Sequence, residues 1–199
     1  MSTRIAAHAA IAAALLAVSC STAPKSEEGK SDVDSRAKAT LATARSTDPS
    51  MSNVLHRSVG YAVFPNVGKG AVGVGGAYGK GVLYENGPDG NGFDSNDARP
   101  DGKLPTTPSG YCDLTQATIG AQIGGQTYSE ILVFSDRSAV ERFKNGQFAF
   151  DAQATAVAVK SGAGSNARFS DGVAVFTMGE TGLMLEAAVG GQRFRYQPR

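Results

Sequence analysis

Residues 68–81 read GKGAVGVGGAYGKG, and half of them are glycine. The stretch contains G-x-G-x-x-G from Gly68 to Gly73, a pattern typical of dinucleotide-binding turns. Such a turn opens a helix, but the residues after Gly73 lack a helical period and contain too much glycine to nucleate one. They alternate instead, with Val74 and Tyr78 on one parity and glycine or alanine on the other. The pattern therefore favours a strand with one nearly bare face over a phosphate-binding loop.

Residues 1–19 have the features of a signal peptide of the lipoprotein type. Arg4 precedes an apolar stretch over 5–18 that is too short to cross a membrane. The residues LAVSC at 16–20 resemble the lipobox of bacterial lipoproteins, which implies that Cys20 carries lipid and becomes the first residue. Ordinary signal cleavage nearby is the alternative. With Ser21 after the cysteine, the resemblance implies a lipid-anchored protein of the bacterial cell envelope, at the outer membrane and facing the periplasm.

The charge balance after this leader argues against nucleic acid as a partner. Loss of Arg4 leaves eighteen basic and eighteen acidic residues, so the remaining chain is formally neutral. Such a chain does not attract nucleic acid over its whole surface, and any anion site must be a local patch. The second cysteine, Cys112, is either a buried thiol or, if Cys20 bears no lipid, its disulfide partner.

Few residues are suited to catalysis or metal binding. His8 leaves with the leader, so His56 is the one histidine that remains, and a site with several histidine ligands is excluded. No pair of carboxylates has the pattern of a general acid and base. Asp89 and Asn91 resemble the start of a calcium loop, but Phe93 occupies the next ligand position and no closing glutamate follows. The sequence therefore predicts no enzyme, no catalytic residue, no metal and no cofactor.

The rest of the chain divides into a tether and one domain. Residues 20–31 are polar and contain proline, glycine and serine, which predicts a flexible tether. Residues 32–199 are enough for a single domain with a core. A loop at 87–110 with five glycines, four prolines and four aspartates interrupts it. Loops of this length are functional or mobile, and the composition favours a mobile surface insertion.

Hydrophobic periodicity predicts helices first and strands afterwards. Four apolar residues recur at helical spacing in the first helix: Val33, Ala37, Leu41 and Ala44. A second short helix over 51–57 follows Pro49, and Ser135 is placed to cap a third over 136–144 that ends at Gly146.

The period then changes to two. Strands are predicted over 61–64, closed by Pro65, over 71–84 as one long strand or a bent pair, and over 117–128, 131–134 and 148–159. The segments 173–178 and 183–194 are predicted to form a hairpin.

Three glycine pairs recur in these strands, each after an apolar residue and close to an aromatic one. The pairs are Gly75-Gly76, Gly124-Gly125 and Gly190-Gly191. They predict strands that bend or approach a neighbour at equivalent heights. We therefore expect an α+β fold with a strongly coiled, mostly antiparallel, glycine-rich sheet or partly closed barrel. N-terminal helices and one short helix after the central strands complete it.

These segments together resemble the SYLF lipid-binding domain family, found in bacterial envelope proteins and in eukaryotic membrane and actin regulators. The most specific block is GYAVFPNVGKG at 60–70, which is similar to the family's G-x-A-V-F-P-x-V-x-K-G signature. The blocks IGAQIGGQ at 119–126 and GLMLEA at 182–187 extend the resemblance, which runs from Ala39 to Arg195. The chain departs from the family at Ala71-Val72, where glycine and an aromatic residue are commoner, and in the long loop.

The resemblance implies phospholipid binding, with phosphoinositides favoured in eukaryotic members and actin bundling in some. In a bacterial envelope it implies affinity for anionic membrane phospholipid or another amphiphile. Lys69 and Lys80 flank the glycine-rich strand, and Arg193 and Arg195 share a parity near the C-terminus, so these four are the expected lipid-binding residues. Solvated lysines at strand ends are the alternative for the first two.

Two functions from different classes follow. The first is a membrane-anchored, non-catalytic module that binds phospholipid. The second is a structural or interaction protein whose sheet binds an envelope protein partner. Lipid at Cys20 would attach the chain in either case, so membrane location does not separate them.

Overall fold

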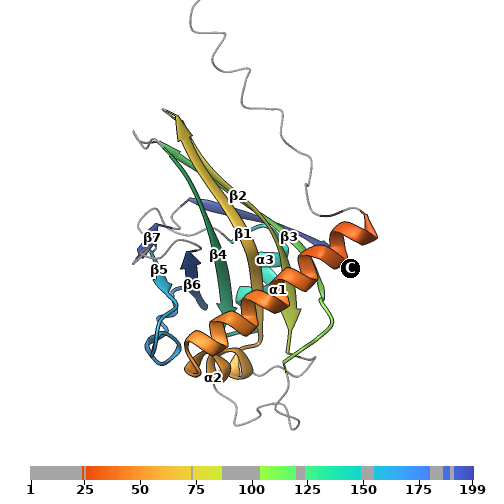
Figure 1. Cartoon of the computed structure of the whole chain (residues 1–199). Coiled ribbons are helices and arrows are strands. Elements are labelled where there is room, and N and C mark those ends of the chain that lie inside the picture. Colours follow the sequence, from red (N-terminus) through yellow and green to blue (C-terminus); the bar gives the residue numbers. More distant parts are fainter. Residues whose placement is uncertain are drawn as a thin grey trace, which may run out of the picture.

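The computed structural model describes residue 24 and residues 26–72, 74–86, 104–119, 124–148, 155–179, 186–188 and 191–199 (Figure 1). The signal peptide predicted at 1–19, Cys20, Gly190 and residues 87–103 of the predicted loop lie outside the described residues. The elements follow one another as α1 (Glu27–Thr47), α2 (Ser50–Arg57), β1 (Gly60–Val72), β2 (Val74–Glu85), β3 (Gly110–Ile119), β4 (Gly124–Phe134), α3 (Arg137–Lys144), β5 (Thr155–Ala158), the short 3₁₀ helix η3 (Gly164–Asn166), β6 (Val173–Gly179), β7 (Glu186–Ala188) and β8 (Gln192–Pro198).

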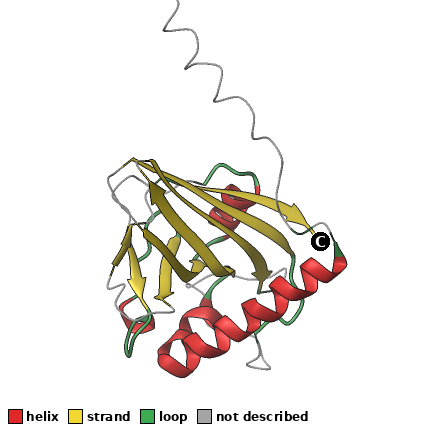
Figure 2. Ribbon diagram, turned by 45° about the horizontal axis from the view of Figure 1, so that its top comes forward, coloured by secondary structure: helices red, strands yellow, loops and turns green. Residues whose placement is uncertain are grey.

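Within the described part of the chain, the strands form one eight-stranded sheet in the order β7-β5-β6-β4-β1-β2-β3-β8. Neighbouring strands are antiparallel except β5 and β6, which are parallel. Figure 2 shows α1 and α2 on one side of the sheet and α3 on the other. The predicted α+β fold with a mostly antiparallel sheet is confirmed.

A contact between β4 and β8 shows that this sheet is strongly coiled. β1, β2 and β3 separate the two strands in the sheet, yet the Gln192 amide donates a hydrogen bond of 2.9 Å to the Glu130 carboxylate. In a flat sheet the two strands would lie about 19 Å apart, because neighbours are spaced by about 4.8 Å. The sheet therefore curls around one of its faces, and β7 and β8 stay unpaired with each other within the described residues.

Both faces of the sheet carry a core, because successive residues of a strand point to opposite sides. On the face enclosed by the curl, which we call the inner face, Phe64 packs with Phe143 of α3 and Phe194 of β8. On the opposite, outer face, Tyr61 and Val63 belong to the core that α1 and α2 cover. The two helical layers thus bury the two parities of β1.

Helix α1 begins inside the stretch predicted as a tether at 20–31. Ser26 caps it by accepting a hydrogen bond from the Gly29 N–H, and Glu27 and Glu28 in the first turn suit the helix dipole. The tether prediction is therefore corrected from Glu27 onward. The predicted apolar stripe is confirmed, since its four members are buried: Val33, Ala37, Leu41 and Ala44.

The glycine-rich stretch forms a hairpin, where one long strand or a bent pair was expected over 71–84. β1 and β2 pair from Gly60 with Glu85 up to Val72 with Val74, so the chain reverses within the predicted strand. Pro65 does not close the first strand either, because β1 continues past it through an irregular register. Proline cannot donate to the ladder, and a bulge is one place where a strand tolerates it.

The strand predicted over 117–128 is also divided in two. β3 ends at Ile119 and β4 begins at Gly124, and β4 continues through the predicted strand 131–134. In both regions the residues next to the turn are as apolar and as glycine-rich as those within the strands. The alternation therefore could not reveal where the chain reverses.

The hairpin predicted from 173–178 and 183–194 is wrong. β6 pairs with β4 and β5, β7 pairs with β5, and β8 pairs with β3. Burial of Phe194 in the inner core accompanies the transfer of β8 to the other end of the sheet. Proximity in the sequence suggested a local pairing, but the pairing is long-range.

Helix α3 is predicted correctly, with a different cap. The carboxylate of Asp136, and not the hydroxyl of Ser135, accepts the hydrogen bond from the Ala139 N–H at 2.9 Å. Gly146 takes a positive φ of 67°, as a residue that ends a helix does.

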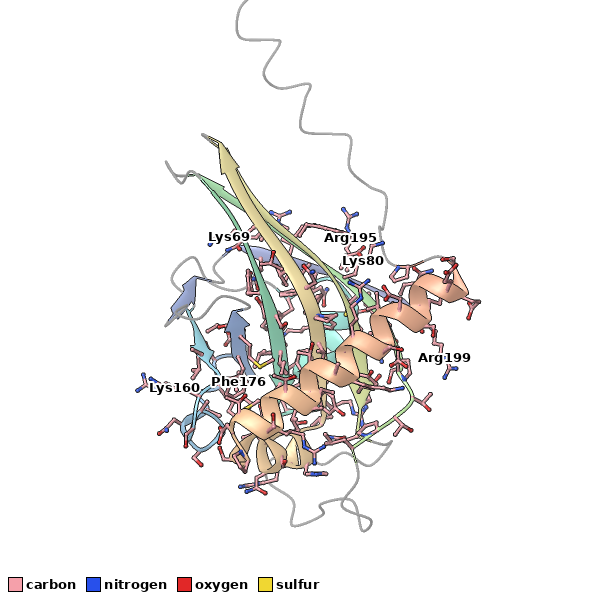
Figure 3. The ribbon with its side chains drawn as sticks, in the orientation of Figure 1. Lys69, Lys80, Lys160, Phe176, Arg195 and Arg199 are labelled. Atoms are coloured by element: carbon pink, nitrogen blue, oxygen red, sulfur yellow. The ribbon has the colours of Figure 1, made fainter. Side chains whose placement is uncertain are left out.

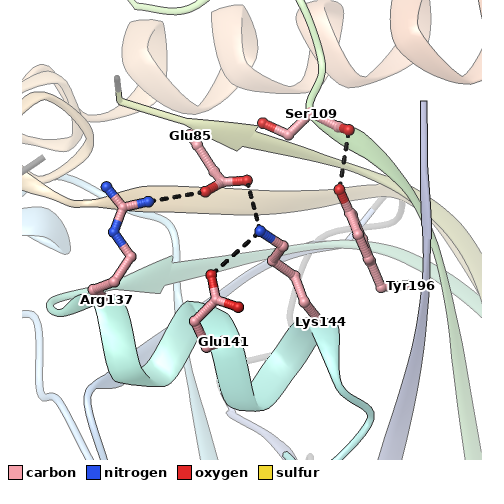
Figure 4. Close-up of polar contacts among 6 residues, drawn as sticks. All are labelled: Glu85, Ser109, Arg137, Glu141, Lys144 and Tyr196. Atoms are coloured by element: carbon pink, nitrogen blue, oxygen red, sulfur yellow. Dashed lines mark hydrogen bonds and ion pairs between the residues drawn. The ribbon is translucent and has the colours of Figure 1, made fainter. Parts of the chain in front are cut away.

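An ion-pair network fastens α3 to the end of the sheet (Figure 4). Arg137 and Lys144 contact the two carboxylate oxygens of Glu85 in β2, at 3.1 and 3.4 Å, and Lys144 also contacts Glu141 at 3.3 Å. The Tyr196 ring of β8 lies 5.7 Å from the Lys144 ammonium. One helix thereby links β2 and β8, two strands that carry expected site residues.

Candidate functional site

The strand register brings three of the four expected cations to the outer face. Lys80 of β2 pairs with Asp113 of β3, and Asp113 pairs with Arg195 of β8, so the three lie side by side. Arg193 lies two residues from Arg195 in β8, so the two side chains share a face. That face is the outer one, because the alternate residues Gln192 and Phe194 are buried on the inner face. We call Lys80, Arg193 and Arg195 the outer cation cluster.

Lys69 lies on the inner face, away from this cluster. It pairs with Ala77, a member of the inner core, and with Gln126. Directly paired residues share a face of the sheet, so Lys69 shares the inner face with Ala77. Lys80 pairs with Asn66, which lies on the outer face. In Figure 3, Lys80 and Arg195 lie together and Lys69 lies apart from them. The structure thus separates the two lysines that the sequence grouped.

The outer cation cluster is charged and accessible. Arg193 and Arg195 are exposed and Lys80 is half-buried. Neither Lys80 nor the Arg193 side chain forms an ion pair with a described residue. The charges of α1 are instead paired along the helix, for example Arg36 with Asp32. Buried Asp113 offsets one charge, so the cluster keeps a positive balance.

A groove of about 450 Å³ lies between the start of α1 and the outer face of the β1–β2 hairpin. Ser26 and Arg36 line it from the helix, and Gly68, Tyr78 and Lys80 line it from the hairpin. Tyr78 is 40% exposed, an unusual exposure for a large ring in the described part of the chain. Aromatic rings beside cations are typical of surfaces that meet the headgroup region of a bilayer.

The predicted glycine pairs of β2 and β4 lie at equivalent heights. Gly70 of β1 pairs with Gly76 and Gly125, and the next row joins Ala71 to Gly75 and Gly124. A Cβ added at Gly76 would lie 3.0 Å from the Gln116 carbonyl oxygen of β3. Gly76 therefore lets β2 and β3 approach closely, and the row as a whole is part of the sheet and not a loop before a helix.

The inner face holds a polar group that the sequence analysis missed. Glu130 is fully buried, accepts the hydrogen bond from Gln192 and pairs with Thr177 of β6. Burial raises the pKa of Glu130 to about 7, against the opposing effect of hydrogen bonds from Gln192 and Tyr128. An acidic residue in the apolar strand segment SEILVF was the available signal. This group joins β8 to β4 and lies on the face opposite the cation cluster.

The described residues contain no group of His, Cys, Asp and Glu side chains placed to hold a metal ion. Cys112 is buried on the inner face, and burial raises the pKa of its thiol. Among the helices of the described ranges, none combines the length and apolar character needed to cross a bilayer.

Together, the fold and the cation cluster define an α+β domain with the features of a binding module. Residues 115–197 match the model of the Ysc84 family, described as a Las17-binding protein actin regulator and also known as SYLF. This match agrees with the resemblance that the motifs indicated, over the C-terminal part of the chain. The family is one of lipid binding and interaction and is not known for catalysis.

A relative is similar to this chain over a segment of comparable length. Beta cell expansion factor A of Aeromonas veronii is 29% identical over 84 residues, which are 42% of this chain and 32% of that protein. The match thus covers about a third of the curated relative. The block at 60–70 that carried the resemblance most specifically lies before the segment matched by the family model.

Proposed function

We propose that this chain is a non-catalytic module of the bacterial envelope that binds anionic phospholipid through the outer cation cluster, and that lipid on Cys20 anchors it to the outer membrane, facing the periplasm. The observation that carries the proposal is the register of β2, β3 and β8, which gathers Lys80, Arg193 and Arg195 on one accessible face. The match to the model of a lipid-binding family supports phospholipid as the ligand class.

The spacing of the cluster suits a membrane surface better than one small anion. Lys80 and Arg195 are two strands apart, about 10 Å, and Arg193 and Arg195 are about 7 Å apart along one strand. Three cations near an anionic surface contribute on the order of 3 kcal/mol, which alone gives only reversible association. A lipid at Cys20 would make this association persistent, because tethering raises the effective concentration of headgroups.

The test compares two double variants in the chain from residue 20 onward with Cys20→Ser, which cannot be lipidated. Lys80→Gln with Arg193→Gln removes two charges of the cluster and leaves Arg195 beside Asp113. We expect binding to vesicles of equal parts phosphatidylcholine and phosphatidylglycerol to weaken about thirtyfold, at about 1 kcal/mol per charge. Lys160→Gln with Arg168→Gln, two exposed charges beyond β5, is the matched control and should bind like the parent chain.

The parent chain should prefer these vesicles to pure phosphatidylcholine, and the preference should fall as salt rises. Equal loss of vesicle binding in both double variants would mean that binding depends on the net charge of the chain and not on the outer cation cluster. Absence of binding to either vesicle would favour the second function, an interaction protein that uses its sheet to bind a protein partner.

A further inference from the structure

The ends of the four central strands, β4, β1, β2 and β3, form one uncharged surface. Gly70 pairs with Gly76 and Gly125, Gly76 pairs with Ala117, and Val74 pairs with Ile119. The strand ends of β4, β1, β2 and β3 therefore lie side by side. We call the described residues 70–72, 74–76, 117–119 and 124–125 the tip. In Figure 1 these strand ends extend beyond the rest of the sheet.

The sequence of the tip is suited to lipid and not to water. No charged residue occurs between Lys69 and Lys80, or between Asp113 and Glu130, in a chain in which 19% of residues are charged. The described tip residues are glycine, alanine, valine, isoleucine and one threonine. An uncharged end of a sheet that extends from the body is typical of a surface that a partner or a membrane covers.

Cations and an aromatic ring border the tip on both faces. Lys69, on the inner face, directly precedes the tip residue Gly70, and Tyr78, on the outer face, lies two residues from Gly76. Thr115 pairs with both Tyr78 and Arg193, so Arg193 lies at the same height as Tyr78. Lys80 is two residues further from the tip than Tyr78, on the same outer face. In proteins that enter an anionic bilayer, aromatic and basic residues lie at the headgroups and apolar residues lie deeper. The tip and its border have the same arrangement.

We propose, resting on the proposed function, that the tip inserts into the outer part of the acyl region of an anionic phospholipid bilayer, with Lys69, Tyr78 and Arg193 at the headgroups. Val74 lies four residues beyond Tyr78, at most about 13 Å deeper. The depth is limited by backbone groups at the sides of the tip. Within the described residues, β6 pairs with β4 only from Tyr128 and β8 pairs with β3 only as far as Gln116. Open strand edges are too costly in the centre of the bilayer.

Insertion is tested with an environment-sensitive fluorophore on Val74→Cys in the chain from residue 20 onward with Cys20→Ser. The same label on exposed Lys160→Cys is the control, and buried Cys112 makes the unsubstituted chain the blank. With vesicles of equal parts phosphatidylcholine and phosphatidylglycerol, the Val74 label should brighten and shift to the blue. A nitroxide near the top of the acyl chain should quench it more than one near the methyl end, and the Lys160 label should not respond.

Lys69→Gln supplies a second readout that needs no label. Insertion brings Lys69 to the headgroups and predicts binding about fivefold weaker, whereas docking by the outer face alone predicts no change. If the chain sediments with the vesicles but the Val74 label stays in water, or is quenched best from the bilayer centre, the tip does not insert as proposed and the proposed function stands. If the parent chain does not bind anionic vesicles at all, both proposals fail.

Discussion

At the residue scale, Gly81 and Gly68 show that glycines of one hairpin have different roles. A Cβ at Gly81 would lie 2.6 Å from the Phe64 ring and 2.8 Å from the Val63 carbonyl oxygen, whereas a Cβ at Gly68 would meet nothing within 4 Å. Phe64 cannot move freely, because its ring packs against Phe194 at 5.7 Å between centroids.

We therefore expect Gly81→Ala to lose about 1–3 kcal/mol of unfolding free energy through overpacking. Gly68→Ala, the matched control, should change stability by less than about 0.5 kcal/mol or raise it slightly, because alanine restricts the unfolded chain. Urea denaturation of the two variants and the parent chain measures both. Equal stabilities would show that the inner face at Gly81 is looser than its contacts indicate.

Glu130 gives a second prediction, on the pH dependence of stability. Burial raises the pKa of Glu130 to about 7 in the folded chain, from an ordinary value of 4.5, so the folded state holds the proton more tightly. Stability therefore falls as pH rises from about 4.5 to about 7 and stays reduced above it, by on the order of 3 kcal/mol.

Glu130→Gln removes the ionisable group and with it this pH dependence of stability. The amide oxygen of the new side chain can still accept the hydrogen bond from Gln192. The difference in unfolding free energy between the parent chain and the variant should favour the parent chain more at pH 5 than at pH 8. Urea denaturation at both pH values measures it. Glu141→Gln, an exposed carboxylate on α3, is the control and should not alter the profile. Parallel profiles for the parent chain and Glu130→Gln would mean that Glu130 ionises normally inside the sheet.

At the element scale, local patterns predicted the helices well and the strand connections poorly. The stripe from Val33 to Ala44 and the end of α3 at Gly146 are determined within a few residues, and the structure confirms both. The reversal between Val72 and Val74 leaves no comparable signal, since the alternation of small and apolar residues continues through it. Lys69 and Lys80 were grouped because they flank the glycine-rich stretch, and the pairing of β1 with β2 shows that they lie on opposite faces of the sheet.

Long-range pairing explains the remaining errors at this scale. β8 pairs with β3, about 80 residues away in the chain, and the contact that reveals the coil, Gln192 with Glu130, joins residues 62 apart in sequence. The cation cluster was partly predictable because the shared parity of Arg193 and Arg195 is local. Lys80 joins them only because β2, β3 and β8 are neighbours in the sheet. The sequence pattern of a single segment does not reveal which strands are neighbours.

At the scale of the whole molecule, the start of α1 lies between Cys20, the proposed anchor, and the candidate site. Ser26 caps α1 and lines the groove beside Tyr78 and Lys80. Five residues lie between Cys20 and Ser26 in the sequence, so the six Cα–Cα steps span at most about 21 Å. A lipid at Cys20 would therefore hold the outer face of the hairpin close to the membrane surface, where its cations contribute even if each is weak.

This arrangement predicts how two attachments combine in the cell envelope. The unaltered chain should remain in the membrane fraction at high salt, because two or more acyl chains give stable anchoring. Cys20→Ser should be retained in part at low salt and released at high salt, since the cation cluster then acts alone and is screened. Cys20→Ser combined with Lys80→Gln and Arg193→Gln should be soluble at both. Fractionation with detergent extraction as the reference measures all three, and a Cys20→Ser chain that resists high salt would show that Cys20 is not the anchor.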